Sequence, residues 1–433
     1  MPRMVPSITL LDRSDMNTTI ADIGAETMRE TMLKQAQELP LDQLDVSNWH
    51  LMENDAIWPY FERLRNEDPI HYHADSRYGP FWSITRFDDI KDVDQNHKVF
   101  SSEGSIGIMD MSDDFATPMF IAMDQPKHDV QRKAVSPVVA PRNLAEMEAV
   151  IRERAGKILD SLPIGETFNW VDKVSIELTT QMLATLFNFP FEDRRKLTYW
   201  SDVTSMPGLT MQERRDAMLD CLACFTDLWH QRVDQDPSFD LISLMIHGDG
   251  TKDMVNNPME YLGNILLLIV GGNDTTRNSI SGGVLALNQF PEQYDKLRAN
   301  PSLIPNMVAE IIRWQTPLAF MRRTALEDFD LKGKQIKKGD KVIMWYASGN
   351  RDESKFENAN ELIIDRPNAR NHISFGFGIH RCMGNRLAEM QLRVLWEEIM
   401  QRFENVEVVG KPTRIRSNFI RGYSELPVRL HAK

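Results

Sequence analysis

Residues 375–384 read FGFGIHRCMG and form the most informative stretch of the chain. Two glycines precede Cys382 and Gly384 follows it, so the backbone can bend tightly and approach a flat molecule closely. A helix is predicted to begin near Met383 with the positive end of its dipole directed at Cys382, a placement that favours a thiolate. Because no His-Cys cluster accompanies it, Cys382 suits a single axial metal ligand better than zinc, which takes four ligands.

The same stretch resembles the haem-binding loop of the cytochrome P-450 monooxygenases. Six positions match the family motif: Phe375, Gly376, Gly378, His380, Cys382 and Gly384. The resemblance implies haem b with an axial thiolate from Cys382, and it places Phe375 and Gly376 against the cofactor. It also implies the cytochrome P-450 fold, mainly α with a smaller β portion, in which the haem lies between a long central helix and the helix after the cysteine. The alternative is a tight loop around a buried, inert cysteine.

A long central helix is predicted over residues 258–290. Asn257 can cap it, Pro258 stands in its first turn and Pro291 limits its far end. At 1.5 Å per residue the helix would span about 50 Å, long enough to cross a whole domain. Its middle, GGNDTT over residues 271–276, consists of poor helix formers whose polar groups would be buried. A structural or functional role is therefore needed to explain why these polar groups would be buried.

This middle stretch resembles the oxygen-binding stretch of the family, in which an acid precedes a threonine. Asp274 and Thr275 occupy these positions, and the resemblance implies that they are catalytic residues that help deliver protons to bound dioxygen. Gly271 stands at the first position of the stretch and leaves extra room above the iron. The alternative for Thr275 is a hydrogen bond to a carbonyl one turn earlier that only bends the helix.

An acid and a base stand three residues apart in EIIR, as Glu310 and Arg313. Such a spacing places both on one helical face, and in most proteins it marks a surface pair. The resemblance implies instead that the pair is buried and joined by Arg366 of the later segment IIDRPNARNHISFG. All three are then structural residues that hold the cysteine loop under the haem.

Four cationic side chains are candidates for the haem propionates. His128 and Arg132 stand four residues apart on a helix opened by Pro126, which alone indicates a solvated face. In the family such a pair binds a propionate, and Arg323 and His380 occupy positions that do the same. Arg322 is the competing candidate for the position of Arg323.

Composition excludes several other classes of protein. The 50 Lys+Arg and 63 Asp+Glu residues give a net charge of −13, which argues against a nucleic-acid-binding protein. No stretch approaches the roughly 20 apolar residues of a membrane span, and no secretory leader is evident, so a cytoplasmic protein is expected. Of the three cysteines, Cys221 and Cys224 are interpreted as packing residues of a helix, because a c-type haem would need His at position 225, which is Phe.

The chain is predicted to comprise an N-terminal extension over residues 1–45 and a single haem-thiolate monooxygenase domain over residues 46–433. Residues 21–40 indicate a surface helix, and the alternating residues 71–87 indicate a hairpin. Apolar periodicity predicts further helices over residues 58–65, 141–162, 172–188, 191–205, 211–234, 302–315 and 384–403. Strand-like pieces cluster late, at 329–346 and 404–430.

Five segments resemble a narrower group, the bacterial alkane and fatty-acid ω-hydroxylases of P-450 family 153. They are MFIAMDQPKHDVQRKAV, LLLIVGGNDTTRNSISGG, EIIRWQTPLAFMRRTA, MWYASGNRDESKF and SNFIRGYS. The resemblance implies insertion of one oxygen atom of O2 into a terminal C–H bond of a medium-chain alkane or fatty acid. Alternatives are hydroxylation of another small hydrophobic substrate such as a terpenoid, a haem-thiolate peroxygenase, and a haem-thiolate sensor or electron carrier.

A terminal C–H bond is harder to break than its neighbour, so terminal selectivity requires a narrow apolar tunnel that admits only the chain end. Candidate wall residues are Leu267, Val270, Gly271, Leu318, Ala319 and Phe419, for each of which ordinary core packing is the alternative. Residues 101–120 lack clear periodicity and are a candidate mobile lid.

Electrons are expected to come from separate proteins, because the sequence has no FMN-like or Rossmann module. By family likeness these are a [2Fe–2S] ferredoxin and its reductase, which draws on NAD(P)H. Ferredoxins are acidic as a rule, so a basic docking face is predicted on the cysteine side. Its candidate residues are Lys127, Arg132, Lys133, Arg142, Arg381, Arg386 and Arg393.

Overall fold

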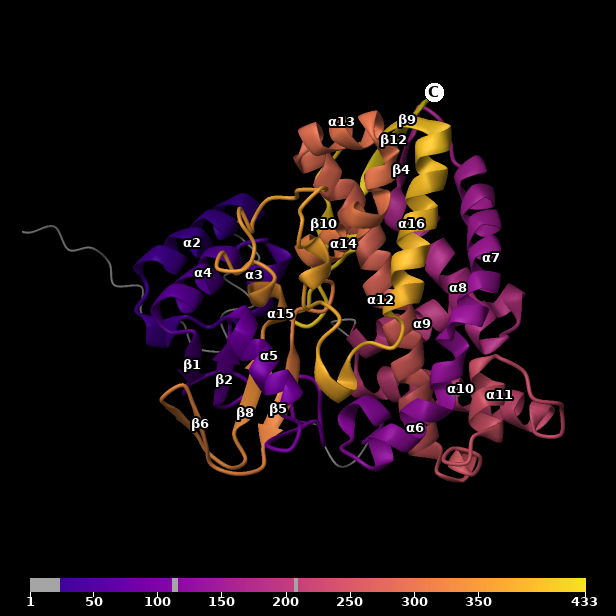
Figure 1. Ribbon diagram of the computed structural model, residues 1–433, viewed down its shortest axis with the longest axis horizontal. Coiled ribbons are helices and arrows are strands. Elements are labelled where there is room, and N and C mark those ends of the chain that lie inside the picture. Colours follow the sequence, from indigo (N-terminus) through magenta and orange to yellow (C-terminus); the bar gives the residue numbers. More distant parts are fainter. Residues whose placement is uncertain (1–23, 111–115, 206–208) are drawn as a thin grey trace, which may run out of the picture.

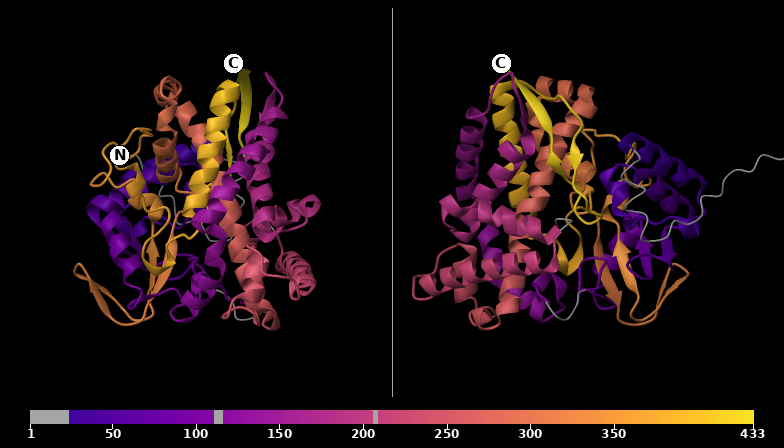
Figure 2. Two further views of the ribbon diagram at one scale, coloured as in Figure 1. Left: turned by 45° about the vertical axis from the view of Figure 1, so that its right-hand side comes forward. Right: turned by 180° about the vertical axis from the view of Figure 1, so that it is seen from behind.

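The computed structural model describes residues 24–110, 116–205 and 209–433. Helices make up most of the molecule and a smaller β portion lies to one side, which confirms the predicted fold class (Figure 1). The sheet and the N-terminal helices occupy one half of the molecule, and the helices from α7 to α12 together with α16 occupy the other. The same division is visible from the side and from behind (Figure 2).

Helix α12, Pro258–Gln289, runs through the helical half and contacts α8, α9, α10, α14 and α16. Its bounds agree with the prediction to within one residue. Asn257 stands at the N-cap position, but its side chain makes no capping hydrogen bond, contrary to the predicted role. The polar middle remains helical because its buried groups find partners: the Asn273 amide oxygen accepts from the Thr179 hydroxyl at 2.8 Å.

Around α12 the predicted helices are present with small changes at their ends. Their bounds are α4 Trp58–Glu67, α7 Pro141–Asp160, α8 Glu177–Phe187, α9 Arg195–Ser205, α10 Met211–Arg232, α14 Ile304–Gln315 and α16 Asn385–Arg402. A π-helical turn, Val171–Ile176, precedes α8. Helix α6, Lys127–Val135, follows Pro126 as predicted. Periodicity did not indicate the shorter helices α3 Trp49–Glu53, α5 Phe87–Gln95, α11 Leu241–His247, α13 Pro291–Ala299 and α15 Tyr346–Gly349.

The main sheet has five strands in the order β1-β2-β8-β5-β3. The predicted hairpin is confirmed as β1, Ile70–His73, paired antiparallel with β2, Phe81–Ile84. Strand β8, Lys341–Met344, lies parallel to β2 and antiparallel to β5, Met321–Ala325, which the sequence analysis missed. Strand β3, Phe100–Ser101, forms the far edge.

Three smaller β units complete the fold. Strands β6, Phe329–Leu331, and β7, Lys334–Ile336, form a hairpin within the predicted region 329–346. The C-terminal region holds β9, Phe403–Val408, and β12, Pro427–Ala432, with β4, Thr167–Asn169, added at one edge. Strands β10, Thr413–Arg414, and β11, Tyr423–Glu425, form a separate pair.

Helix α2, Ala25–Glu38, packs against α4. Met32 and Ala36 are buried, and the Tyr60 hydroxyl donates to the Met32 carbonyl at 2.9 Å. This part of the predicted extension therefore shares the apolar core that contains Phe61 and Trp345. Residues 1–23 of the extension lie outside the described residues, and the division of the chain at residue 45 stays a prediction.

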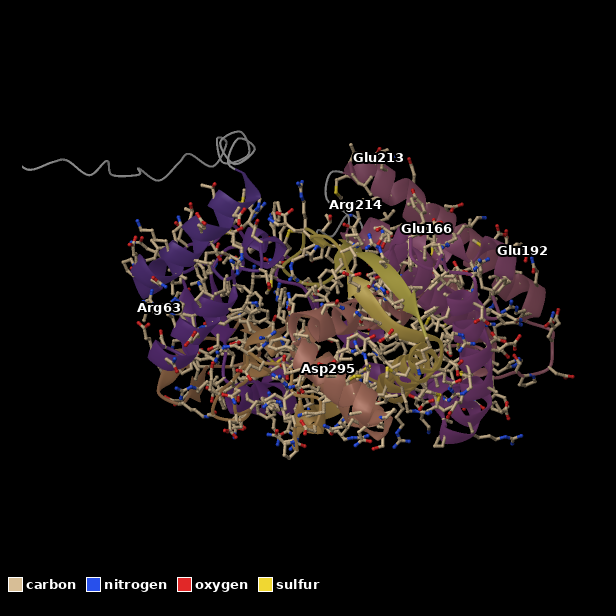
Figure 3. The ribbon with its side chains drawn as sticks, turned by 90° about the horizontal axis from the view of Figure 1, so that it is seen from above. Arg63, Glu166, Glu192, Glu213, Arg214 and Asp295 are labelled. Carbon is tan, nitrogen blue, oxygen red and sulfur yellow. The ribbon has the colours of Figure 1, made fainter. Side chains whose placement is uncertain are left out.

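Charged side chains lie on the outside of the molecule: in Figure 3 the labelled Arg63 and Glu213 lie at its edge, and Asp295 lies on the face turned toward the viewer. Within the described residues, no helix has the length and apolar character that a membrane span requires. Cys221 is fully buried among apolar residues and Cys224 packs against the same cluster. The described residues contain no group of three or more His, Cys, Asp or Glu side chains placed to hold a metal ion.

Candidate functional site

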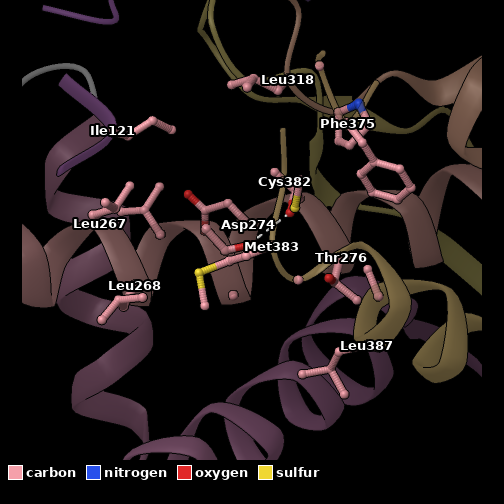
Figure 4. Close-up of a pocket in the computed structure, with 18 of the residues that line it drawn as sticks. Ile121, Leu267, Leu268, Asp274, Thr276, Leu318, Phe375, Cys382, Met383 and Leu387 are labelled. Carbon is pink, nitrogen blue, oxygen red and sulfur yellow. Dashed lines mark hydrogen bonds between the residues drawn. The ribbon is translucent and has the colours of Figure 1, made fainter. Parts of the chain in front are cut away.

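A cavity of about 470 Å³ lies between the middle of α12 and the loop that carries Cys382. Figure 4 shows Leu267 and Asp274 of α12, Phe375 and Cys382 of the loop, and Leu318 around it. Most of its lining side chains are apolar, and the polar ones are few, as is usual for a site that binds an apolar molecule.

The loop around Cys382 is held in a tight conformation. The Cys382 amide donates to the Phe375 carbonyl at 2.8 Å. Gly376 and Gly378 have φ of +65° and +68°, a region that favours glycine, and a Cβ at Gly378 would lie 2.7 Å from the Asp94 carbonyl oxygen. The Asp94 carboxylate also accepts the Phe377 amide at 2.8 Å. These contacts explain why the motif needs glycine at Gly378.

The surroundings of the Cys382 thiol pull its pKa in opposite directions. Burial raises the pKa, whereas the amides of Gly384 and Asn385 and the charges of Arg132 and Arg381 lower it. The amides at the start of the helix therefore lower the pKa of Cys382, as predicted. Burial has the larger effect, so the pKa of the thiol is raised overall. A bound metal reverses this balance, since a coordinating thiol is deprotonated outright.

Glu310, Arg313 and Arg366 form one buried cluster behind the loop. Arg313 donates to both carboxylate oxygens of Glu310 at 2.7 Å, and Arg366 donates to the same oxygens at 3.0 and 3.1 Å. Arg313 also binds the Asn350 carbonyl at 2.7 Å. The Asn350 side chain in turn accepts the Ile373 amide at 2.8 Å, which links the cluster to the segment entering the cysteine loop.

Two histidines lie together at the edge of the cavity. The ring centroids of His128 and His380 are 4.2 Å apart. His128 Nδ1 lies 2.7 Å from a carboxylate oxygen of Asp129, whereas its Nε2 and both nitrogens of His380 are buried with no hydrogen-bond partner in the described part of the chain. Burial, together with nearby cations, lowers the pKa of His380 to about 2. Buried nitrogens without partners fit an anionic group that enters the cavity from outside the chain.

The pairing of β5 with β8 separates the two candidate arginines. Arg322 stands opposite Ile343 and Arg323 opposite Val342, so their side chains leave opposite faces of the sheet. Arg323 lines the cavity and binds Asp94 at 2.7 Å, whereas Arg322 binds Asp110 at 2.7 Å. Arg132 also lines the cavity. The structure thus brings His128, Arg132, Arg323 and His380 to one side of the cavity and leaves Arg322 out.

Asp274 is buried where α12 borders the cavity. One of its carboxylate oxygens accepts from the Ser201 hydroxyl at 3.0 Å and lies 3.1 Å from the Arg277 guanidinium. The other oxygen has no partner among the described residues. Burial raises the pKa of Asp274, although the charge of Arg277 opposes the shift. A carboxyl group with a raised pKa and a free oxygen is suited to exchange protons with the cavity.

Thr275 also lines the cavity, and its hydroxyl donates to the Gly271 carbonyl at 3.1 Å. This is the hydrogen bond that the alternative interpretation of Thr275 predicts, to a carbonyl one turn earlier on the same helix. The bond does not exclude a role at the cavity, since a hydroxyl keeps its acceptor lone pairs while it donates. A Cβ added at Gly271 would meet no atom within 4 Å, so this glycine leaves open space on the wall.

Of the predicted wall residues, Leu267, Val270, Gly271, Leu318 and Phe419 line the cavity together with Phe375 and Gly376. Ala319 does not, and its prediction is corrected: its side chain is fully buried in the cluster around Phe320 and Trp345. Leu318 pairs with Ile420 in an isolated bridge beside the cavity, whereas Ala319 packs into this core and its amide donates to the Phe419 carbonyl at 2.8 Å.

Other lining residues were missed by the sequence analysis. They include Met182, Leu183, Leu186 and Thr276. The α8 leucines follow the same apolar periodicity as core residues, so no local signal distinguishes them. Of the candidate lid over residues 101–120, residues 111–115 lie outside the described residues, while Ile106 and Thr117 line the cavity beside them.

The predicted basic face is smaller than the sequence suggested. Lys127 pairs with Glu260 at 2.8 Å, Arg142 with Glu146 at 3.7 Å and Arg393 with Glu148 at 2.8 Å. Arg132, Arg381 and Arg386 remain together and line a second hollow on the far side of Cys382.

The model of the cytochrome P450 family matches residues 164–421. The chain is 34% identical to linalool 8-monooxygenase from Pseudomonas putida, over 91% of this chain and 100% of that protein. It is 32% identical to a methyl-branched lipid omega-hydroxylase from Mycobacterium bovis, over 90% of this chain and 95% of that protein.

Solved structures agree with this assignment. A cytochrome P450-153 from Novosphingobium aromaticivorans superposes with a TM-score of 0.85 and 47% identity, covering 90% of this chain and 99% of that one. CYP153D17 from a Sphingomonas species gives a TM-score of 0.85 and 48% identity, covering 90% and 100%. The predicted resemblance to family 153 and the predicted fold are thereby confirmed.

Proposed function

The chain belongs to the cytochrome P450 family, a family of monooxygenases, and we propose that it inserts one oxygen atom of O2 into a terminal C–H bond of a medium-chain hydrocarbon. The observation that carries the proposal is the apolar cavity, which Leu267, Val270 and Leu318 line together with Cys382. The 32% identity to a methyl-branched lipid omega-hydroxylase supports oxygen insertion at the end of a chain.

The residues of the site fit a haem, which the family implies with a cysteine thiolate as ligand. Cys382 would hold the iron, and the unpartnered nitrogens of His128 and His380 would bind propionate oxygens with Arg132 and Arg323. When bound, the haem supplies the activation of O2 that the side chains of a protein do not provide. Glu310, Arg313 and Arg366 keep the cysteine loop in place behind it.

Asp274 and Thr275 face the opposite side of the same cavity. The free carboxylate oxygen of Asp274 can take up a proton, and its raised pKa keeps part of the group protonated at higher pH. The Thr275 hydroxyl can hold a water or dioxygen with its acceptor lone pairs while it donates to Gly271. We assign to this pair the delivery of protons to the reacting oxygen.

The charges of the wall favour an uncharged chain over an ionised fatty acid. Among the described lining residues, the arginines are Arg132 and Arg323, both on the propionate side. A carboxylate at the far end of the cavity would therefore lose its hydration without gaining a cation. We expect octane to bind more tightly than octanoate.

A second candidate substrate is a terpenoid, which the 34% identity to linalool 8-monooxygenase favours. A terpenoid alcohol is also uncharged and suits the same apolar wall.

Electrons would come from NAD(P)H through a reductase and a [2Fe–2S] ferredoxin. The hollow lined by Arg132, Arg381 and Arg386 is the docking site that we propose for the acidic ferredoxin.

Reconstitution of the haem-loaded protein tests the function. We expect oxidation of octane with ferredoxin, reductase, NAD(P)H and O2, and slower oxidation of laurate and linalool. Turnover that is equally fast with hydrogen peroxide alone would instead establish a peroxygenase. Reduction by ferredoxin should slow several-fold in Arg386→Glu and depend on salt, whereas Lys411→Glu, at an exposed lysine outside the predicted docking face, serves as the control.

A further inference from the structure

We propose that Gly263 and Asn264 of α12 are positioning residues that fix the cavity wall formed by residues 117–120 and thereby set substrate specificity. Neither residue belongs to the cavity lining, whereas Thr117, Met119 and Phe120 do. The inference about specificity rests on the proposed function, because it takes the cavity to be the substrate site.

Gly263 is the point at which the wall segment meets the long helix. A Cβ at this position would lie 2.2 Å from the Pro118 carbonyl oxygen and 2.8 Å from the Thr117 carbonyl oxygen. Both contacts are with backbone atoms, so a side chain could be accommodated only by movement of the segment itself. Glycine is therefore required here by close approach of two backbones rather than by its own conformation.

Asn264 adds a hydrogen bond beside this contact. Its amide oxygen accepts the Phe120 amide N–H at 3.0 Å, and its amide nitrogen donates to the Gln131 side chain at 3.1 Å and to the Glu260 carbonyl at 3.0 Å. Asn264 and Phe120 are both buried. A buried N–H group without a partner is costly, so the wall segment is held in register with α12 at Phe120.

The same network continues into α6. The Gln131 amide donates to the Glu260 carboxylate at 2.5 Å, and Lys127 pairs with the same carboxylate at 2.8 Å. Helix α6 also carries His128 and Arg132, which we place at the haem propionates. Asn264 thus joins the substrate side of the cavity to the helix on the cofactor side, so displacement of the wall changes the distance between the two.

Two variants test the contact directly. Gly263→Ala should push the wall segment away from α12, and Asn264→Leu should release the Phe120 amide. Matched controls lie on the same helix: a Cβ at Gly283 meets flexible atoms of Ile311, and Asn288 bonds the backbone of β9 through Val406 and Val408. Gly283→Ala and Asn288→Leu therefore make the same substitutions away from the wall.

Hydrogen–deuterium exchange of a peptide spanning residues 116–122 measures the contact without reference to catalysis. We expect exchange to accelerate about tenfold or more in Gly263→Ala and Asn264→Leu and to stay unchanged in the two controls, with similar melting temperatures among all four. Unchanged exchange in both variants would overturn the proposed positioning role.

Binding of 1-alkylimidazoles from butyl to dodecyl to the haem-loaded protein measures the consequence for the cavity. Because an imidazole ligates haem iron whatever the natural substrate is, this series is independent of the proposed function. The dodecyl-to-butyl affinity ratio should change about tenfold in the two variants and not in the controls. A ratio that stays constant while exchange accelerates would overturn the specificity role. Failure to oxidise octane with all of these binding results intact would overturn only the proposed function.

Discussion

The two sides of the cavity are held in different ways. On the cysteine side, ionic and hydrogen-bonding groups far apart in the chain converge, and Glu310, Arg313 and Arg366 bind one another in a fully buried cluster. On the opposite side, the surface that faces the cavity is formed mainly by apolar side chains, among them Leu267, Leu318 and Phe419. Ionic clusters demand one geometry, whereas apolar contacts tolerate exchange of one side chain for another. The fixed side therefore serves the chemistry and the tolerant side serves the choice of substrate.

The largest effect is expected at Cys382, because it alone carries the bond to iron on the fixed side. Cys382→Ser should abolish the red-shifted carbon monoxide spectrum of thiolate-ligated ferrous haem. Cys221→Ser, in the apolar core at a distance from the cavity, is the control and should keep that spectrum. Retention of the thiolate spectrum in Cys382→Ser would show that another residue holds the iron.

A large loss of stability is expected when the buried cluster is broken. Arg366→Leu leaves the fully buried Glu310 with one of its two arginines, and loss of one partner from a buried ionic group costs about 3–5 kcal/mol. The free energy of unfolding in guanidinium chloride measures this cost. Arg142→Leu, which breaks the exposed pair with Glu146 at 3.7 Å, should cost much less. Equal losses in the two variants would contradict the comparison.

A smaller effect is expected at Asp274, and it depends on pH. Burial raises the pKa of the Asp274 carboxyl group in the folded protein above the ordinary value of 3.8. The protonated group therefore contributes its full stability below pH 3.8, and this contribution declines as the pH rises through the pKa of the folded state. Asp274→Asn cannot ionise, so its unfolding free energy should decline less over the same pH range.

Asp274→Asn should also reduce product formation by roughly 10²-fold, the usual contribution of a general acid. The ratio of product to NAD(P)H consumed measures this loss. If the unfolding free energies of wild type and variant change in parallel with pH, and the ratio of product to NAD(P)H is unchanged, Asp274 does not deliver protons.

The sequence predicted the fixed side far better than the tolerant side. Cys382, Glu310 and Arg313 stand in short motifs, because their geometry depends on spacing along one loop or one helix turn. The Asp94 carboxylate accepts hydrogen bonds from Arg323, from the Tyr346 hydroxyl and from the loop amide of Phe377, yet no motif indicated Asp94. Its contacts join residues more than 200 positions apart, and only the folded chain brings them together.

The tolerant side was predicted in part. Leu318 and Phe419 line the cavity as expected, but Ala319 packs into the core around Phe320 and Trp345, because periodicity does not reveal which residues of an irregular segment face a cavity. Strand β5 was missed because two of its buried positions are arginines, Arg322 and Arg323, and because burial along it does not alternate. The contacts of Gly263 with Thr117 and Pro118 left no trace in the local pattern either.

The position of oxygen insertion into octane tests the division between the two sides most directly. Leu318→Ala widens the apolar side and leaves Cys382, Asp274 and the buried cluster unchanged. We predict that the ratio of 1-octanol to 2-octanol falls about tenfold while product per NAD(P)H changes little, and that Leu303→Ala, a half-buried leucine outside the lining, leaves both unchanged. An unchanged alcohol ratio in Leu318→Ala would contradict the claim that the apolar side sets the site of attack.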